Sequence, residues 1–142
     1  MEINSYSFPI KPETFGVDYV FPEDLTKLTL EALGQLMSRI AAYRGYTLSL
    51  LARFEPKKKI GEQVHRLKFI EKTREFDDGG VQKRAKEKAE IDREVVALST
   101  IVYDNEAKSE FLSTLVTMYT GHIEVISREI SRRQFASNMR GE

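Results

Sequence analysis

The chain has 142 residues, and its 22 basic and 22 acidic side chains leave it without net charge at pH 7. It contains no cysteine, which excludes disulfides and thiol chemistry and favours a cytoplasmic protein. No apolar run approaches the roughly 18 residues of a membrane span, so we expect a single soluble domain without membrane contact.

Residues 1–21 are predicted to form an extended arm, because Phe8-Pro9 and Lys11-Pro12 interrupt any helical periodicity. The arm is too rich in aromatic side chains for a plain disordered tail: Tyr6, Phe8, Phe15, Tyr19 and Phe21. We expect these rings to dock on a neighbouring molecule or on the chain's own core.

Residues 22–142 are predicted to form an all-α domain, an elongated bundle of about four helices at residues 23–55, 57–76, 82–103 and 106–135. Pro22 and Pro56 stand where first helical residues are expected, since proline is favoured there. Asp77-Asp78-Gly79-Gly80 should end the second helix, and Asp104-Asn105-Glu106 should cap the last one. The third helix starts almost wholly polar, so we expect it to project into solvent or to meet a ligand.

The last predicted helix carries an apolar row that we call the seam. Its members alternate spacings of four and three residues: Leu112, Val116, Tyr119, Ile123, Ile126 and Ile130. That average of 3.5 residues is the period of a coiled coil. The seam therefore predicts that the chain oligomerises through its long C-terminal helix.

The sequence offers no catalytic constellation, so we expect a protein that is not an enzyme and uses neither cofactor nor metal. Glu62 and His65 have the Glu-x-x-His spacing of di-iron bundles, but His122 lacks a glutamate three residues earlier. No P-loop surrounds Gly79-Gly80.

Basic residues supply the main functional signal. Lys57, Lys58 and Lys59 follow Pro56, where cations in the first turn of a helix cost roughly 0.3–1 kcal/mol each. Their presence there indicates an anionic partner, although a solvated face is the alternative. The candidate nucleic-acid contacts are Lys57, Lys58, Lys59, Arg66, Lys68, Lys72, Lys83 and Arg84. Phe54, Phe69 and Phe76 are either stacking surfaces for bases or core residues.

Two local patterns stand out: Thr26-Lys27-Leu28 with Glu31-Ala32, and Lys58-Lys59 followed by Arg66-Leu67-Lys68-Phe69. In these patterns the chain resembles, from Thr26 to its C-terminus, the UvsY family of phage recombination mediators. Near the end, the stretch from Ile130 to Phe135 is similar to the family's pattern after its last long helix.

The resemblance implies a homo-oligomeric ring of helical protomers that binds single-stranded DNA. It implies a protein that loads a RecA-like recombinase onto strands coated with single-strand-binding protein, in the bacterial host's cytoplasm if the chain is phage-encoded. It places Lys58, Lys59, Arg66 and Lys68 at phosphates and the last helix in the oligomer interface. The alternative is a helical protein–protein interaction or assembly module, either a phage structural adaptor or an inhibitor of a host system.

Overall fold

The structure is a computed structural model that describes residues 10–16 and 19–141. In these ranges the chain is all-α, as predicted, with the helices α1 (Leu30–Glu75), α2 (Gln82–Glu90) and α3 (Arg93–Met139). A short 3-10 helix, Leu25–Lys27, precedes α1. No helix in the described ranges is both long and apolar enough to cross a bilayer. The prediction of four helices is wrong, because two of the expected breaks do not occur.

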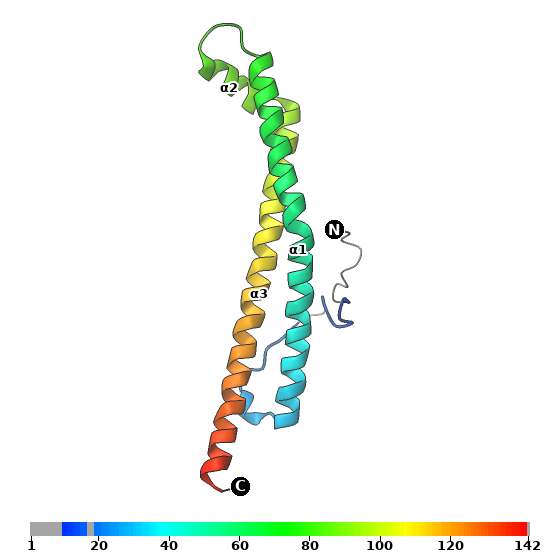
Figure 1. Cartoon of the computed structure of the whole chain (residues 1–142), viewed down its shortest axis with the longest axis vertical. Helices are drawn as coiled ribbons and strands as arrows, with labels where there is room; N and C mark the ends of the chain where they lie inside the picture. Colours follow the sequence, from blue (N-terminus) through cyan, green and yellow to red (C-terminus); the bar gives the residue numbers. More distant parts are fainter. Residues whose placement is uncertain (1–9, 17–18, 142) are drawn as a thin grey trace, which may run out of the picture. The chain divides into compact units, whose positions relative to one another are not determined.

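The described residues form two compact units. Unit 1 contains the described residues up to Leu50 together with those from Leu112 onward, and unit 2 is Leu51–Phe111. Helices α1 and α3 run through both units, whereas α2 belongs to unit 2 (Figure 1). Each unit therefore contains one stretch of α1 and one stretch of α3, packed against each other.

The first long helix begins later than predicted. Asp24 caps the 3-10 helix instead, since its carboxylate Oδ1 accepts a hydrogen bond of 3.0 Å from the Thr26 amide. The hydroxyl of Thr29 then accepts one of 3.1 Å from the Ala32 amide and so occupies the N-cap position of α1. Asp24 therefore caps the 3-10 helix and not α1.

Pro56 lies inside α1 rather than at a helix start. Without an N–H it cannot bond the carbonyl of Ala52, one turn earlier. Both residues are exposed, so water can reach the freed carbonyl. Across the helix pair, the Glu55 carboxylate accepts a hydrogen bond of 2.6 Å from the buried Ser109 hydroxyl and holds this part of α1 on α3. Packing thus overrides the local preference, and Lys57–Lys59 lie in mid-helix rather than at a positive helix end.

We expect Pro56→Ala to stabilise the protein. An interior proline costs a helix up to about 3 kcal/mol relative to alanine, and alanine restores the missing hydrogen-bond donor. The free energy of unfolding should rise by about 1–3 kcal/mol in urea titrations followed by circular dichroism at 222 nm. An unchanged or lowered value would show that α1 does not continue through this position in solution.

The turn between α1 and α2 forms as predicted from Asp77-Asp78-Gly79-Gly80. The carboxylates of Asp77 and Asp78 each accept a hydrogen bond of 3.0 Å from the amide two residues later. Gly79 has φ of 81°, a conformation that side chains disfavour. The turn ends α1 and lets α2 begin at Gln82.

Helix α2 is not polar all round. Ala85 and Ala89 are buried, and they are four residues apart, hence on one face. Their small side chains let α2 pack against the rest of unit 2, which is why a search for large apolar residues misses this contact. The remaining α2 side chains are exposed.

Helix α3 is capped by Asp92, not by Asp104. The Asp92 Oδ1 atom accepts hydrogen bonds of 3.0 Å and 3.3 Å from the amides of Glu94 and Val95. Asp104-Asn105-Glu106 lies within the continuous helix. Both aspartates precede helix-forming sequence, and only the packing of α2 decides which one starts the helix.

The core of unit 1 forms between α1 and α3. Its buried members are Leu25, Leu33, Ile40, Tyr43, Tyr119 and Ile126. Tyr119 and Ile126 belong to the seam, and Ile123 and Ile130 are partly buried against the same cluster. The seam therefore packs, at four of its six positions, in the core that α1 and α3 form within the chain. Its role as an oligomer interface stays a prediction.

The described arm residues dock on unit 1. Phe15, Tyr19 and Phe21 pack against its core, whereas Tyr6 and Phe8 lie outside the described residues. The ring of Phe21 stacks on His122 with centroids 4.0 Å apart. The Tyr19 hydroxyl lies 3.0 Å from His122 Nδ1, and a neutral histidine protonated at Nε2 accepts this hydrogen bond. The sequence left open whether the rings dock on a neighbouring molecule or on the chain's own core. The described rings dock on the chain's own core.

This docking makes the stability of unit 1 dependent on pH. Burial lowers the pKa of His122 below its usual 6.5. Below about pH 6.5 the unfolded chain takes up a proton that the folded unit resists, so the free energy of unfolding falls as pH falls. Urea midpoints at about pH 8 and pH 5 should therefore differ more in the wild type than in His122→Phe, which keeps a stacking ring but does not titrate. Equal pH dependence in both proteins would contradict this assignment.

Candidate nucleic-acid interface

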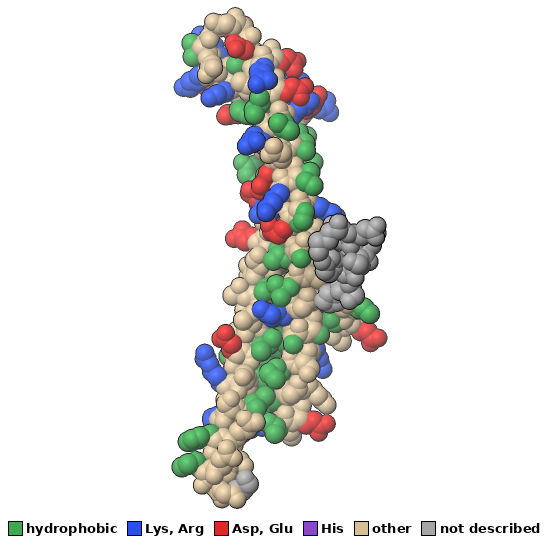
Figure 2. All heavy atoms as spheres, in the orientation of Figure 1, with side chains coloured by type: hydrophobic (Ala, Val, Ile, Leu, Met, Phe, Trp, Pro, Cys, Tyr) green, Lys and Arg blue, Asp and Glu red, His purple; other side chains and the backbone are tan. Residues whose placement is uncertain are grey.

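The eight predicted nucleic-acid contacts all lie in unit 2, but they do not form one equivalent set. Six of them are on α1, between Lys57 and Lys72, and Lys83 and Arg84 are on α2. Figure 2 shows that basic and acidic side chains are mixed on the surface around α2. What separates the eight is whether a carboxylate already neutralises them.

Lys68 and Lys72 are engaged in ion pairs within the unit. The Lys68 ammonium lies 2.7 Å from a Glu94 carboxylate oxygen and 3.4 Å from Glu71. Lys72 lies 3.2 Å from Glu75 and 3.9 Å from Asp92. Hydrogen bonding to Glu94 raises the pKa of Lys68, and hydrogen bonding to Lys68 lowers the pKa of Glu94. These two lysines therefore hold the C-terminal part of α1 against the first turn of α3, and phosphate contact would disrupt that role.

Four of the six candidate cations on α1 remain without such partners, and we call them the basic row: Lys57, Lys58, Lys59 and Arg66. Among the described residues none of them forms an ion pair or a side-chain hydrogen bond. Lys58 is half-buried and the other three are exposed. Lys59 and Arg66 are seven residues apart, so they lie on one face about 10.5 Å apart along the helix. The basic row is thus a set of uncompensated charges available to an anion.

One carboxylate lies within this group. Glu62 is three residues after Lys59 and four before Arg66, so it occupies the same side of α1. It forms no ion pair with either in the described structure. The side chain of Glu62 reduces the local positive potential, but it does not pair with the cations of the basic row.

On α2 the two candidates differ only slightly. Lys83 and Arg84 are both exposed, and Lys83 lies 4.0 Å from Glu87, a contact on the solvent-exposed surface. An exposed pair at that distance contributes at most a few tenths of a kcal/mol. Both cations can therefore turn toward an anion without loss of stability.

Phe54, Phe69 and Phe76 are partly buried on the packed side of α1. Phe69 also lines an open pocket of about 440 Å³ in unit 2, together with His65, Glu90, Val95, Ser99 and Tyr103. The sequence interpretation missed Tyr103, which was placed at the end of a predicted helix. Tyr103 lies inside α3 and is 69% exposed. The sequence would have pointed to it as an exposed helical residue only if that helix had been predicted to continue.

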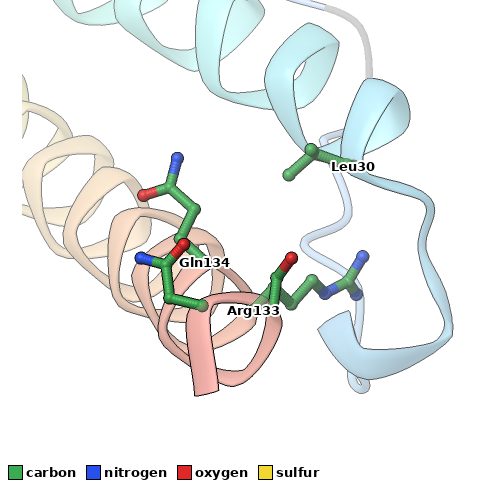
Figure 3. A pocket seen from close by; sticks show the side chains of 5 residues that line it. Leu30, Arg133 and Gln134 are labelled. Atoms are coloured by element: carbon green, nitrogen blue, oxygen red, sulfur yellow. The ribbon is translucent and has the colours of Figure 1, made fainter. Parts of the chain in front are cut away.

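A second pocket, of about 500 Å³, lies in unit 1 and is lined by Leu30, Arg133, Gln134, Ser137 and Asn138 (Figure 3). Its one charged group is already engaged. Arg133 donates from Nη2 to the carbonyls of Leu25 and Thr26, at 3.0 Å and 3.3 Å, and from Nε to Glu129 at 2.9 Å. Hydrogen bonds from Arg132 and Arg133 lower the pKa of Glu129 to about 2. These contacts fasten the 3-10 helix to α3, so the pocket offers no uncommitted charge.

In the described residues no group of three or more histidine, aspartate or glutamate side chains is arranged to hold a metal ion. The Glu62 and His65 pair stands alone on α1. The basic row and the pocket beside Phe69 are thus the chemically distinctive features of unit 2. Comparisons with protein-family models, with curated proteins and with solved structures find no match to this chain.

Proposed function

We propose that the chain is a non-enzymatic single-stranded-DNA-binding protein that acts as a phage recombination mediator. The observation that carries the proposal is the basic row: four cations on one helix that no carboxylate of unit 2 neutralises, beside Lys68 and Lys72, which are neutralised. Packing accounts for the paired lysines. The members of the basic row form no ion pair or side-chain hydrogen bond within the unit, so the contacts that explain Lys68 and Lys72 do not explain them.

Phosphates supply the missing counter-charge. If each member of the basic row contacts one phosphate, the logarithm of the binding constant falls with the logarithm of salt concentration at a slope of about −3 per protomer. Four contacts on one protomer give weak binding at physiological salt. Several copies side by side on one strand would multiply the contacts.

We propose that copies associate through an apolar row on the outer side of α1, which we call the outer stripe. Its members are Ile60, Val64, Leu67 and Ile70, exposed by 64%, 45%, 54% and 40%. The first three have the spacing of four and three that suits helix pairing. Their exposure leaves an apolar surface that packing within the chain does not cover, unlike the seam.

The mediator role draws on the resemblance to the UvsY family, whose members load a RecA-like recombinase onto strands coated with single-strand-binding protein. An assembly with a repeated basic row would hold such a strand while the coating protein is exchanged. Adding the chain to a coated strand should then shorten the lag before a RecA-like recombinase forms filaments.

Native mass spectrometry of the full chain, with and without oligo-dT, tests assembly and strand binding together. We expect an assembly of several copies that gains the mass of a strand, and we expect Val64→Glu with Leu67→Glu to reduce it to smaller species. A protein that assembles but never carries a strand would instead favour the interaction-module alternative. A monomer that ignores DNA would overturn both parts of the proposal.

A further inference from the structure

Unit 2 contains a pocket whose lining suits a flat, unpaired ring. His65 and Phe69 come from α1 and Tyr103 from α3, and the space between the helices measures about 440 Å³. This volume lies in the range of roughly 300–1,000 Å³ that is usual for small-molecule sites. Three ring-bearing side chains thus line one opening.

The rings remain available to a ligand. The side chain of Tyr103 is 69% exposed. His65 and Phe69 are only partly buried, and they are four residues apart on α1, so they lie side by side. In the described structure none of the three stacks on another ring, whereas the aromatic residues of unit 1 pack against one another. No other aromatic ring therefore occupies their faces.

Two polar groups lie in the same lining. The Glu90 carboxylate is an acceptor only, and the Ser99 hydroxyl both donates and accepts. Every nucleobase carries at least one N–H donor and one acceptor on its pairing edge, so this combination can bond the edge of an unpaired base.

The pocket lies beside the basic row. Arg66 is three residues before Phe69 and is therefore its neighbour on the helix surface, on the side away from Lys68. Lys58 is seven residues before His65 and shares its face. A strand whose phosphates contact Lys58 and Arg66 would bring a base to the opening.

We propose that the pocket formed by His65, Phe69 and Tyr103 stacks one unpaired nucleobase of the strand that the basic row holds by its phosphates. The proposal rests on the proposed function and adds a base-binding site to it. Stacking on aromatic side chains tolerates every base, because each base has a π face. The site would thus make the protein prefer single strands to duplex without imposing a sequence.

The test measures the affinity of the full-length protein for fluorescein-labelled oligo-dT and for an abasic strand of equal length. Tyr103→Ala should weaken oligo-dT binding by about 5- to 150-fold, the range expected for one lost stacking contact. It should leave the salt slope unchanged, because no phosphate contact is lost. Tyr103→Phe should retain wild-type affinity. Phe135→Ala, which removes an aromatic ring in unit 1 that is 67% exposed, serves as the matched control.

The abasic strand separates stacking from general damage. The wild type should bind it more weakly than oligo-dT, and Tyr103→Ala should no longer distinguish the two strands. If Tyr103→Ala binds as well as Phe135→Ala while the wild type keeps its salt slope, the pocket proposal fails and the proposed function stands. If the wild type binds neither strand at low salt, the proposed function fails, and the pocket proposal fails with it.

Discussion

Replacing Lys57, Lys58 and Lys59 together with alanine should weaken the binding of oligo-dT by roughly two to three orders of magnitude at about 50 mM salt. Three of the four proposed phosphate contacts are lost, and each contributes close to one order of magnitude at that salt concentration relative to 1 M. The fold should be retained, because in the described structure these lysines form no ion pair or side-chain hydrogen bond, and alanine is the best helix former. Fluorescence anisotropy measures the affinity, and circular dichroism checks the helix content.

A matched control distinguishes local contact from net charge. Lys11, Lys27 and Arg140 are exposed cations of unit 1, and their joint replacement with alanine removes the same three positive charges. This variant should bind the strand within a few-fold of the wild type. If it loses as much affinity as the Lys57–Lys59 variant, binding depends on overall charge and the basic row has no special role.

The second large effect concerns the core of unit 1. Ile126→Ala should lower the free energy of unfolding by about 2–5 kcal/mol, because the side chain is fully buried between α1 and α3. Val125→Ala is the matched control. The Val125 side chain adjoins Ile126 in sequence but is 44% exposed, so truncating it to alanine should cost less than about 0.5 kcal/mol. Urea unfolding followed by the near-ultraviolet circular dichroism of the buried tyrosines reports on this unit.

The same experiment decides where the seam packs. The comparison uses Val64→Glu with Leu67→Glu as its background, because that pair removes the proposed association through the outer stripe. If Ile126 is buried within its own chain, the urea midpoints of this background with and without Ile126→Ala should not change with protein concentration. If the seam is buried between copies, the midpoint of the background should rise with concentration, by mass action, and that result would contradict the intrachain core.

Apolar periodicity predicted the helical class and the apolar face of the long C-terminal helix, which was interpreted as an oligomer interface. Leu33, Ile40 and Tyr43 follow one face of α1, and Tyr119 and Ile126 follow one face of α3. The 3.5-residue period does not determine whether the seam packs within its own chain or against a second copy. An intrachain hairpin and an intermolecular coiled coil both require the same spacing, so only the tertiary structure distinguishes them.

Helix boundaries were predicted less well, for two physical reasons. Pro56 is tolerated inside α1 because its lost hydrogen bond is exposed to water and the Glu55 to Ser109 contact holds the helix in place. Asp92 and Asp104 are both suitable capping residues, and the choice between them depends on the packing of Ala85 and Ala89. The first of these involves a contact between residues 54 positions apart, which no local pattern shows.

The candidate site was predicted in composition but not in detail. The expected helix start at Pro56 gave the wrong reason for noticing Lys57–Lys59, because these lysines oppose no helix dipole in mid-helix. That their excess of charge marks an anion-binding surface stays a prediction. Lys68 and Lys72 look equivalent to them in the sequence, and only their contacts with Glu94 and Asp92 mark them as structural.

The salt dependence of strand binding tests the central claim most directly. Wild-type protein should be titrated into labelled oligo-dT by fluorescence anisotropy at a series of salt concentrations. A linear plot of log K against log[salt] with a slope of about −3 per protomer is the predicted result. Absence of binding at the lowest salt, or a slope near zero, would contradict a phosphate-binding role for the basic row.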